Sequence, residues 1–153
     1  MVSIIILSYN TKSLLRSCLS SLLEHLRGFG FEILVFDNAS SDGSVQMIKK
    51  EFTKAKVIES QENLGFAKGC NLGAKNSKGK YILFLNSDTQ VLDNGFISMI
   101  EFMDKNPKVA ILGGKLENSA GSIQPSAGKF YTLYNLIIML LGLERLGLLR
   151  SSP

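Results

Sequence analysis

Short uninterrupted apolar runs alternate with longer stretches of helical periodicity, and this alternation constrains the fold more than any other feature of the sequence. The runs that predict strands are residues 2–7, 32–36, 56–59, 80–85 and 109–112. The stretches that predict helices are residues 14–26, 42–52, 66–76 and 96–103. Strands that alternate with helices favour a parallel sheet, and a strand buried on both faces shows no polar alternation. The sequence therefore predicts an α/β fold with a mainly parallel sheet flanked by helices.

The alternation stops near residue 115, so we expect one domain over residues 1–115 and the beginning of a second over residues 116–153. Of the 153 residues, 45% are apolar and 20% are charged, which excludes disorder and a coiled coil. The net charge of +4 comes without a Lys/Arg block, which suits an anionic ligand or a membrane surface and indicates no nucleic-acid partner. With a single His25 and two distant cysteines, the sequence excludes a His-built metal site and a disulfide framework.

Polar side chains follow three of the predicted strands. They are Ser8, Tyr9 and Asn10, then Asp37 and Asn38, then Asn86, Ser87, Asp88 and Thr89. Open α/β sheets bind their ligands outside the carboxyl ends of the strands, so we expect these clusters to converge there. The first strand is followed by SYNTKS, which matches neither the G-x-G-x-x-G pattern of dinucleotide-binding proteins nor the G-x-x-x-x-G-K-[ST] phosphate-binding loop. Asp88 could instead hold Mg²⁺ or Mn²⁺ between itself and two phosphates, since both ions prefer oxygen ligands.

Four segments resemble the family-2 glycosyltransferases with the GT-A fold. They are VSIIILSYN, ILVFDNASSDGS, ENLGFAKGCNLGAKNSKGKYILFLNSDT and GGKLENSAGSIQPSAGKFYTL, and the last is similar to the rhamnosyltransferase-like branch. The resemblance covers nearly the whole chain, with the pieces in the family's order. It implies a donor domain over residues 1–115 and an acceptor subdomain that begins at 116. It also implies inverting, metal-assisted transfer of a sugar, rhamnose among the candidates, from a dTDP- or UDP-linked donor to a polysaccharide or lipid-linked glycan.

The resemblance implies a role for each matching position. The residues that match the nucleotide-binding positions are Ser8, Tyr9, Asn10, Asp37, Asp42, Asn63, Gly65 and Asn71, with Asp37 as the acid that holds the base. Asn86, Ser87 and Asp88 match the family's D-x-D-like element, with Asp88 as the ligand of Mg²⁺ or Mn²⁺. The structural alternatives stay open: Asp37 could cap a turn, and for Asp42 the helix-cap interpretation is favoured.

The sequence departs from the family pattern at three points. Asn86 replaces the first carboxylate of the D-x-D element, and Cys70 stands where the family often has Arg, with Lys68 as an alternative source of positive charge. No base motif follows Asp93, so we expect the catalytic base beyond Pro153 and the chain to be an N-terminal fragment or a truncated protein. The alternative function is a non-catalytic module that binds a nucleotide or a partner. A nucleotidyltransferase would need a glycine-rich basic loop after the first strand, which this sequence lacks.

The apolar segment 133–149 has three interpretations. It is a core helix of the acceptor half, which we rank first, a helix at a membrane surface, or a contact in a homo-oligomer. The longest uninterrupted apolar stretch within this segment is too short to span a bilayer. The amino terminus of the chain has no basic region that would mark a secretory signal. We therefore expect a cytoplasmic protein with access to the inner face of the membrane.

Overall fold

The computed structural model of the protein describes residues 1–124, 133, 140 and 141. Its elements, in chain order, are β1 (Val2–Ser8), α1 (Lys12–His25), β2 (Phe31–Asp37), α2 (Ser44–Glu51), β3 (Ala55–Glu59), α3 (Phe66–Lys75), β4 (Tyr81–Asn86), α4 (Gly95–Lys105), β5 (Leu116–Glu117) and β6 (Ile123–Gln124). Nearly all of the apolar segment 133–149, whose role the sequence leaves open, lies outside the described residues. No helix in the described part is long and apolar enough to cross a membrane.

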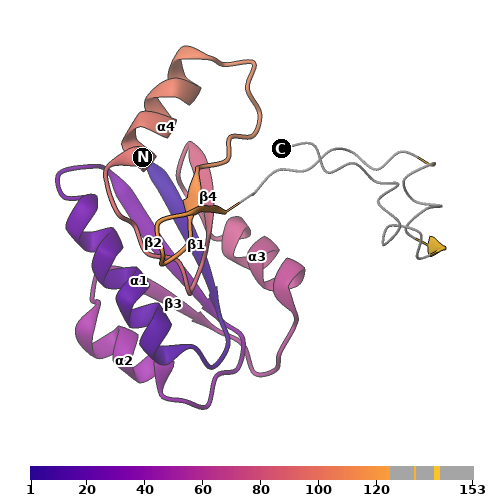
Figure 1. Ribbon diagram of the computed structural model, residues 1–153. Helices are drawn as coiled ribbons and strands as arrows, with labels where there is room; N and C mark the ends of the chain where they lie inside the picture. The colour runs from indigo at the N-terminus through magenta and orange to yellow at the C-terminus, as the bar shows by residue number, and fades with distance from the viewer. Residues whose placement is uncertain (125–132, 134–139, 142–153) are drawn as a thin grey trace. The chain divides into compact units, whose positions relative to one another are not determined.

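Four parallel strands form the sheet in the order β3-β2-β1-β4 (Figure 1). β1 is central, and its residue Ile5 pairs in register with Leu34 of β2 and Phe84 of β4. From β1 the chain proceeds outward through β2 to β3, and then returns to the other side of β1 as β4. The carboxyl ends of β1 and β4 therefore form a topological switch point, which is where open α/β sheets bind ligands. The predicted α/β fold with a parallel sheet is confirmed.

Helices cover both faces of the sheet, as the uninterrupted apolar run of β1 predicts. Side chains of α1, α2 and α4 share one apolar cluster with Ile4 and Ile6 of β1. On the opposite face α3 packs against β1 and β2 (Figure 1). The approach of α3 is close because it presents two glycines, Gly69 and Gly73, to β1. A Cβ atom at Gly73 would lie 2.5 Å from Cγ2 of Ile5, and one at Gly69 would lie 2.4 Å from Cδ1 of Leu7.

One carboxylate, that of Asp42, fixes the beginnings of both α1 and α2. Its Oδ2 accepts a hydrogen bond from the Lys12 backbone N–H at 2.8 Å, and its Oδ1 accepts from the Ser44 N–H at 3.0 Å and from the Ser44 hydroxyl. The residues that precede the two helices, Thr11 and Gly43, make no side-chain cap of their own. A negative charge at a helix N-terminus is favourable because it interacts with the unpaired N–H groups and the helix dipole. These bonds agree with the helix-cap interpretation of Asp42.

The environment of Asp42 acts on its pKa in two directions. Burial works to raise the pKa, but the hydrogen bonds from Ser44 and Lys12 outweigh burial and hold the pKa below its ordinary value of 3.8. The carboxylate is therefore ionised at neutral pH, and its contribution to stability is lost only as the pH falls through this lowered pKa.

The strand predicted over residues 109–112 is wrong. These residues form no strand, and the side chain of Ile111 is 90% exposed. An apolar run becomes a strand only where a neighbouring strand offers its backbone, and none pairs with this one in the described part of the chain. Instead β5 pairs with β6 in a short antiparallel hairpin. The contacts divide the chain into units Met1–Ala110 and Ile111–Pro153, a few residues before the boundary expected at 115.

β4 also differs from a strand buried on both faces, although its sequence is apolar throughout. Its residues Leu83 and Leu85 pack into the cluster beneath α1 and α4, but Ile82 and Phe84 are 44% and 52% exposed. α3 covers β1 and β2 and leaves this part of the sheet open among the described residues.

We expect Asp42→Ala to lower the free energy of unfolding by about 1–2 kcal/mol at neutral pH, because two helices lose their cap. Chemical denaturation at a series of pH values measures this difference. It should shrink as the pH falls below 3.8, since protonation removes the same bonds from the wild-type protein. Glu24→Ala, at an exposed carboxylate of α1, is the control and should change stability by less than about 0.5 kcal/mol. A difference that stayed constant down to low pH would contradict the capping role.

We expect Gly73→Ala to lower the free energy of unfolding by about 1–2 kcal/mol. The added methyl group collides with Ile5, whose branched side chain is stiff, and this overpacking outweighs the better helix propensity of alanine. Urea denaturation gives the comparison. The control is Gly30→Ala, where the added atom meets nothing within 4 Å. Equal stability of the Gly73 variant and the wild-type protein would show that α3 can withdraw from β1 without cost.

Candidate functional site

The loops after β1, β2 and β3 are joined by backbone hydrogen bonds at the carboxyl edge of the sheet. The Asn38 N–H donates to the Ser8 carbonyl at 2.9 Å, and the Ser60 N–H donates to the Asp37 carbonyl at 2.9 Å. In register, Ser8 lies beside Asp37, and Leu7 lies beside Asn86. The structure thus brings the three predicted polar clusters together at one edge of the sheet.

Asp37 is the most informative residue at this edge. It is 2% exposed, its Oδ2 accepts a hydrogen bond from the Ser40 N–H at 2.9 Å, and its Oδ1 is buried without a hydrogen-bond partner in the described residues. A buried carboxylate oxygen that lacks a donor costs free energy, so such an atom requires an explanation. The turn-cap interpretation of Asp37 accounts for Oδ2 alone. Oδ1 remains available to a hydrogen-bond donor that the described part of the chain does not provide.

The β3–α3 loop is built around Asn38, which belongs to one of the predicted polar clusters but was assigned no binding role of its own. The Asn38 side chain is buried, donates to Oδ1 of Asn63 at 2.7 Å and accepts from the Leu64 N–H at 2.8 Å. Oδ1 of Asn63 also accepts from the Gly65 N–H at 2.9 Å. Gly65 has a φ of +78°, which favours glycine, at the entry to α3. Asn63 and Gly65 are thus held beside β2, and the signal for Asn38 was an amide directly after a predicted strand.

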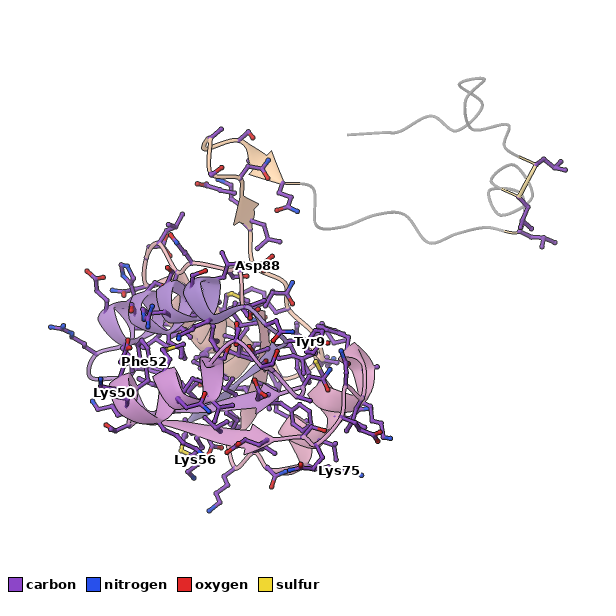
Figure 2. The ribbon with its side chains drawn as sticks, turned by 90° about the horizontal axis from the view of Figure 1, so that it is seen from below. Tyr9, Lys50, Phe52, Lys56, Lys75 and Asp88 are labelled. Atoms are coloured by element: carbon purple, nitrogen blue, oxygen red, sulfur yellow. The ribbon has the colours of Figure 1, made fainter. Side chains whose placement is uncertain are left out.

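The β1–α1 loop is tied to the β2–α2 loop through Asn10. Asn10 has a φ of +54°, its N–H donates to the Ser40 hydroxyl at 2.9 Å, and its Oδ1 accepts from the Ser41 N–H at 2.8 Å. The neighbouring Tyr9 is 49% exposed and is labelled in Figure 2. Asn10 and Asp42 therefore use their side chains to shape the loops, and Tyr9 leaves its ring free to contact a ligand.

The predicted residues on α3 are separate from this network. Asn71 is exposed on α3, and in the described residues it makes no side-chain hydrogen bond to the other site residues. Lys68 is also exposed, whereas Cys70 is buried, and burial raises the pKa of its thiol. A thiol carries no positive charge, so Cys70 cannot take the place of a cationic side chain, whereas the exposed Lys68 can supply a positive charge near this position.

The segment after β4 presents a carboxylate next to an amide. Asn86 and Asp88 are exposed, and Asp88 is labelled in Figure 2. Ser87 between them is 9% exposed, and the Thr89 N–H closes the turn by donating to the Asn86 carbonyl at 3.2 Å. Beneath the turn lies Cys18 of α1. Burial, with a smaller contribution from the charge of Asp88, raises the pKa of the Cys18 thiol to about 12, so the thiol stays protonated.

The donor set at this turn fits a cation that is shared with a ligand. Among the described residues, no group of three or more His, Cys, Asp or Glu side chains lies close enough to hold a metal ion. Mg²⁺ typically binds through one or two carboxylates together with the phosphates of a substrate. One exposed carboxylate with a neighbouring amide oxygen therefore fits an ion held partly by a diphosphate, and does not fit a site made of protein ligands alone.

A hollow of about 530 Å³ lies elsewhere, next to the residue where β2 begins. The last turns of α1 and α2 and the residues that follow them line it, among them Leu26, Phe29 and Phe52. None of the predicted site residues contributes to its wall. Its position at the amino end of the sheet separates it from the switch point.

Comparison of the sequence with known proteins shows which family it matches. The model of the family described as glycosyl transferase family 2 matches residues 3–144. The poly-beta-1,6-N-acetyl-D-glucosamine synthase of Staphylococcus epidermidis is 32% identical over 116 residues, which are 74% of this chain and 28% of that protein. The poly(ribitol-phosphate) beta-glucosyltransferase of Bacillus spizizenii is 32% identical over 132 residues, which are 82% of this chain and 20% of that protein.

Solved structures share the fold. S. aureus TarS 1–349 in complex with UDP-GlcNAc is 28% identical with a TM-score of 0.63, and the match covers 69% of this chain and 32% of that one. The mannosyltransferase PcManGT of Pyrobaculum calidifontis, in complex with GDP-Man and Mn²⁺, is 20% identical with a TM-score of 0.60, over 67% of this chain and 32% of that one. The second likeness concerns the fold alone.

The matches cover only part of the relatives. The chain spans 36%, 28% and 37% of the lengths of three of them, or about a third. The family match nevertheless covers nearly all of this sequence, including every predicted site residue. The chain belongs to glycosyl transferase family 2.

Proposed function

We propose that the chain binds the donor of a glycosyl transfer, a nucleoside diphosphate sugar, at the switch point between the carboxyl ends of β1 and β4. The observation that carries the proposal is the buried Oδ1 of Asp37 at this edge, which has no hydrogen-bond partner among the residues that the structure describes. The exposed carboxylate of Asp88 at the same edge supports it. A nucleotide would engage both carboxylates if its nucleobase bound at Asp37 and its diphosphate lay at Asp88.

Asp37 selects the base by hydrogen-bond chemistry. An ionised carboxylate only accepts hydrogen bonds, so its partner must donate. Uracil and thymine carry a ring N–H at N3, whereas cytosine has an acceptor at the same position. Among pyrimidine nucleotides, Asp37 therefore favours those of uracil and thymine over those of cytosine, and Tyr9 offers a ring on which the base can stack. Fixing the base in this way orients the sugar carbon toward the acceptor.

The diphosphate lies at the turn after β4 in this proposal. Asp88 and the side-chain oxygen of Asn86 hold Mg²⁺ or Mn²⁺ together with phosphate oxygens. When bound, the ion stabilises negative charge on the diphosphate as it leaves. Ser8, Asn10 and Asp42 shape the wall of the nucleotide site on the β1 side. Asn63, Gly65 and Asn71 bound it on the side of α3.

The sugar and the acceptor follow from the relatives' names as further proposals. The relatives reported above are named as a poly-beta-1,6-N-acetyl-D-glucosamine synthase and a poly(ribitol-phosphate) beta-glucosyltransferase, and TarS was solved with UDP-GlcNAc. UDP-GlcNAc and UDP-glucose are therefore the first donors to test, and dTDP-rhamnose is the third. We propose inverting transfer to a polysaccharide or lipid-linked glycan. The catalytic base that deprotonates the acceptor hydroxyl lies, in this proposal, on a part of the protein outside the described residues.

One observation favours a second candidate, a module that binds the nucleotide without transfer. The turn after β4 contains a single carboxylate, because Asn86 stands at the other position. The two functions differ in their products. Release of UDP from UDP-GlcNAc in the presence of glycan acceptors supports transfer, and tight binding of an intact donor supports the module.

We expect Asp37→Asn to weaken UDP binding by about tenfold or more, because a bond to a charged acceptor is lost and an amide can place its own donor against the base. Isothermal titration calorimetry with UDP and CDP measures the effect. The wild-type protein should prefer UDP, and the variant should lose much of that preference. Glu62→Gln, an exposed carboxylate in the β3–α3 loop, is the matched control. An unchanged ratio of the two affinities would show that Asp37 does not contact the base.

We expect Asp88→Asn to abolish the strengthening of UDP binding by Mn²⁺ and to leave metal-free binding almost unchanged, because the amide keeps the shape and removes the charge. Calorimetric titration of UDP and dTDP with and without Mn²⁺ separates the two effects. Glu101→Gln on α4 serves as the control for a lost negative charge. If the variant responds to Mn²⁺ as the wild-type protein does, then Asp88 is not a ligand. If neither nucleotide binds the folded wild-type protein, the proposed donor site is wrong.

A further inference from the structure

Residues 86–91, which carry Asp88 from the end of β4 toward α4, are anchored at both ends by one turn of α1. At the first end, the Cys18 thiol donates to the Asn86 carbonyl at 3.7 Å. At the second end, the Ser21 hydroxyl accepts from the Val91 N–H at 3.0 Å and donates to the Cys18 carbonyl at 2.9 Å. A thiol is a weak donor, so Ser21 provides the stronger anchor.

The anchored ends are buried, and only the middle of the segment reaches solvent. Cys18 is 0% exposed and Val91 is 7% exposed, and both belong to the apolar cluster. Between them the Asn86–Thr89 hydrogen bond closes a turn, and Ser87 lies 9% exposed beneath it. Asp88 thus stands at the exposed part of a short segment with little freedom in its backbone. A carboxylate held in this way loses less entropy when it binds a cation.

α1 also connects the two sides of the switch point. It begins at Lys12, directly after the loop of Tyr9 and Asn10, and less than two turns later it reaches Cys18. A helix of this length is stiff, so the anchors on α1 set the distance between the β1 loop and the turn of Asp88. The two halves of the proposed donor site, the β1–α1 loop and the turn of Asp88, are therefore both held by the same rigid helix.

We propose that Ser21, supported by Cys18, is a positioning residue that holds Asp88 for the divalent cation bound together with the diphosphate. Neither residue reaches the ligand, and both act through the backbone of residues 86–91. The inference rests on the proposed function, because it needs Asp88 to be a metal ligand. A purely structural role, in which the hydroxyl only satisfies the Val91 N–H, would affect stability and would not single out the metal.

The test is the Mn²⁺ dependence of UDP binding in Ser21→Ala. Calorimetry gives the ratio of UDP affinities with and without Mn²⁺, and electron paramagnetic resonance counts the Mn²⁺ bound by the UDP-loaded chain. We expect the ratio to fall about tenfold, as it does when residues that orient metal ligands are removed, while metal-free UDP affinity is unchanged. Ser21→Thr keeps a hydroxyl and should restore the ratio. Ser20→Ala, at an exposed position one residue away on α1, is the control.

Three results would overturn the inference, and they separate it from the proposed function. A normal Mn²⁺ effect in Ser21→Ala would show that the anchor does not position Asp88, and would leave the metal site standing. Equal losses of affinity with and without Mn²⁺ would assign Ser21 a structural role alone. No Mn²⁺ effect in the wild-type protein would overturn both. If Ser21→Ala does not fold, Cys18→Ala removes the other anchor, and the same outcomes apply with a smaller expected change.

Discussion

The pairing of β1 with a strand on each side is the constraint on which the rest of the structure depends. Because β1 is central and parallel to both neighbours, its three isoleucines at 0–1% exposure need apolar partners on two faces, which the helices supply. The same pairing places Ser8 beside Asp37 and Leu7 beside Asn86. The polar loops therefore meet because the buried strands are in register. The pairing of the strands is enough to bring the loops of the candidate site together.

Two aspartates in one turn show how the site divides its charges. Asp42 has both oxygens in hydrogen bonds with the chain, and it stabilises the beginnings of α1 and α2. Asp37, five residues earlier, has one buried oxygen that finds no partner within the described part of the chain. A protein tolerates an unsatisfied carboxylate oxygen where a ligand completes it, so the same turn that holds a structural acid also holds the carboxylate that we propose for recognition of the donor.

The periodicity of the sequence predicted the strands and helices of the sheet, because burial on two faces leaves an unmistakable apolar pattern in β1 and β2. It failed at residues 109–112, where an apolar run has no neighbouring strand. It could not reveal that Asp42 reaches Lys12, 30 residues away, or that Ser21 anchors Val91, since such bonds depend on the packing of distant elements. Asp37 and Asp88 were predicted as site residues from their positions after strands and from the family's motifs, whereas only the three-dimensional structure reveals that Oδ1 of Asp37 has no partner among the described residues.

β4 has a consequence for any attempt to produce the first unit alone. It pairs only with β1 among the described residues, so the other side of its backbone presents unpaired N–H and C=O groups. Beside this edge, Ile82 and Phe84 add exposed apolar area. An unprotected edge with bulky apolar side chains is a template for strand pairing between molecules. A fragment ending at Ala110 would thus have an aggregation-prone strand edge. A charged residue introduced at position 82 or 84 would be the simplest way to prevent its copies from associating in solution.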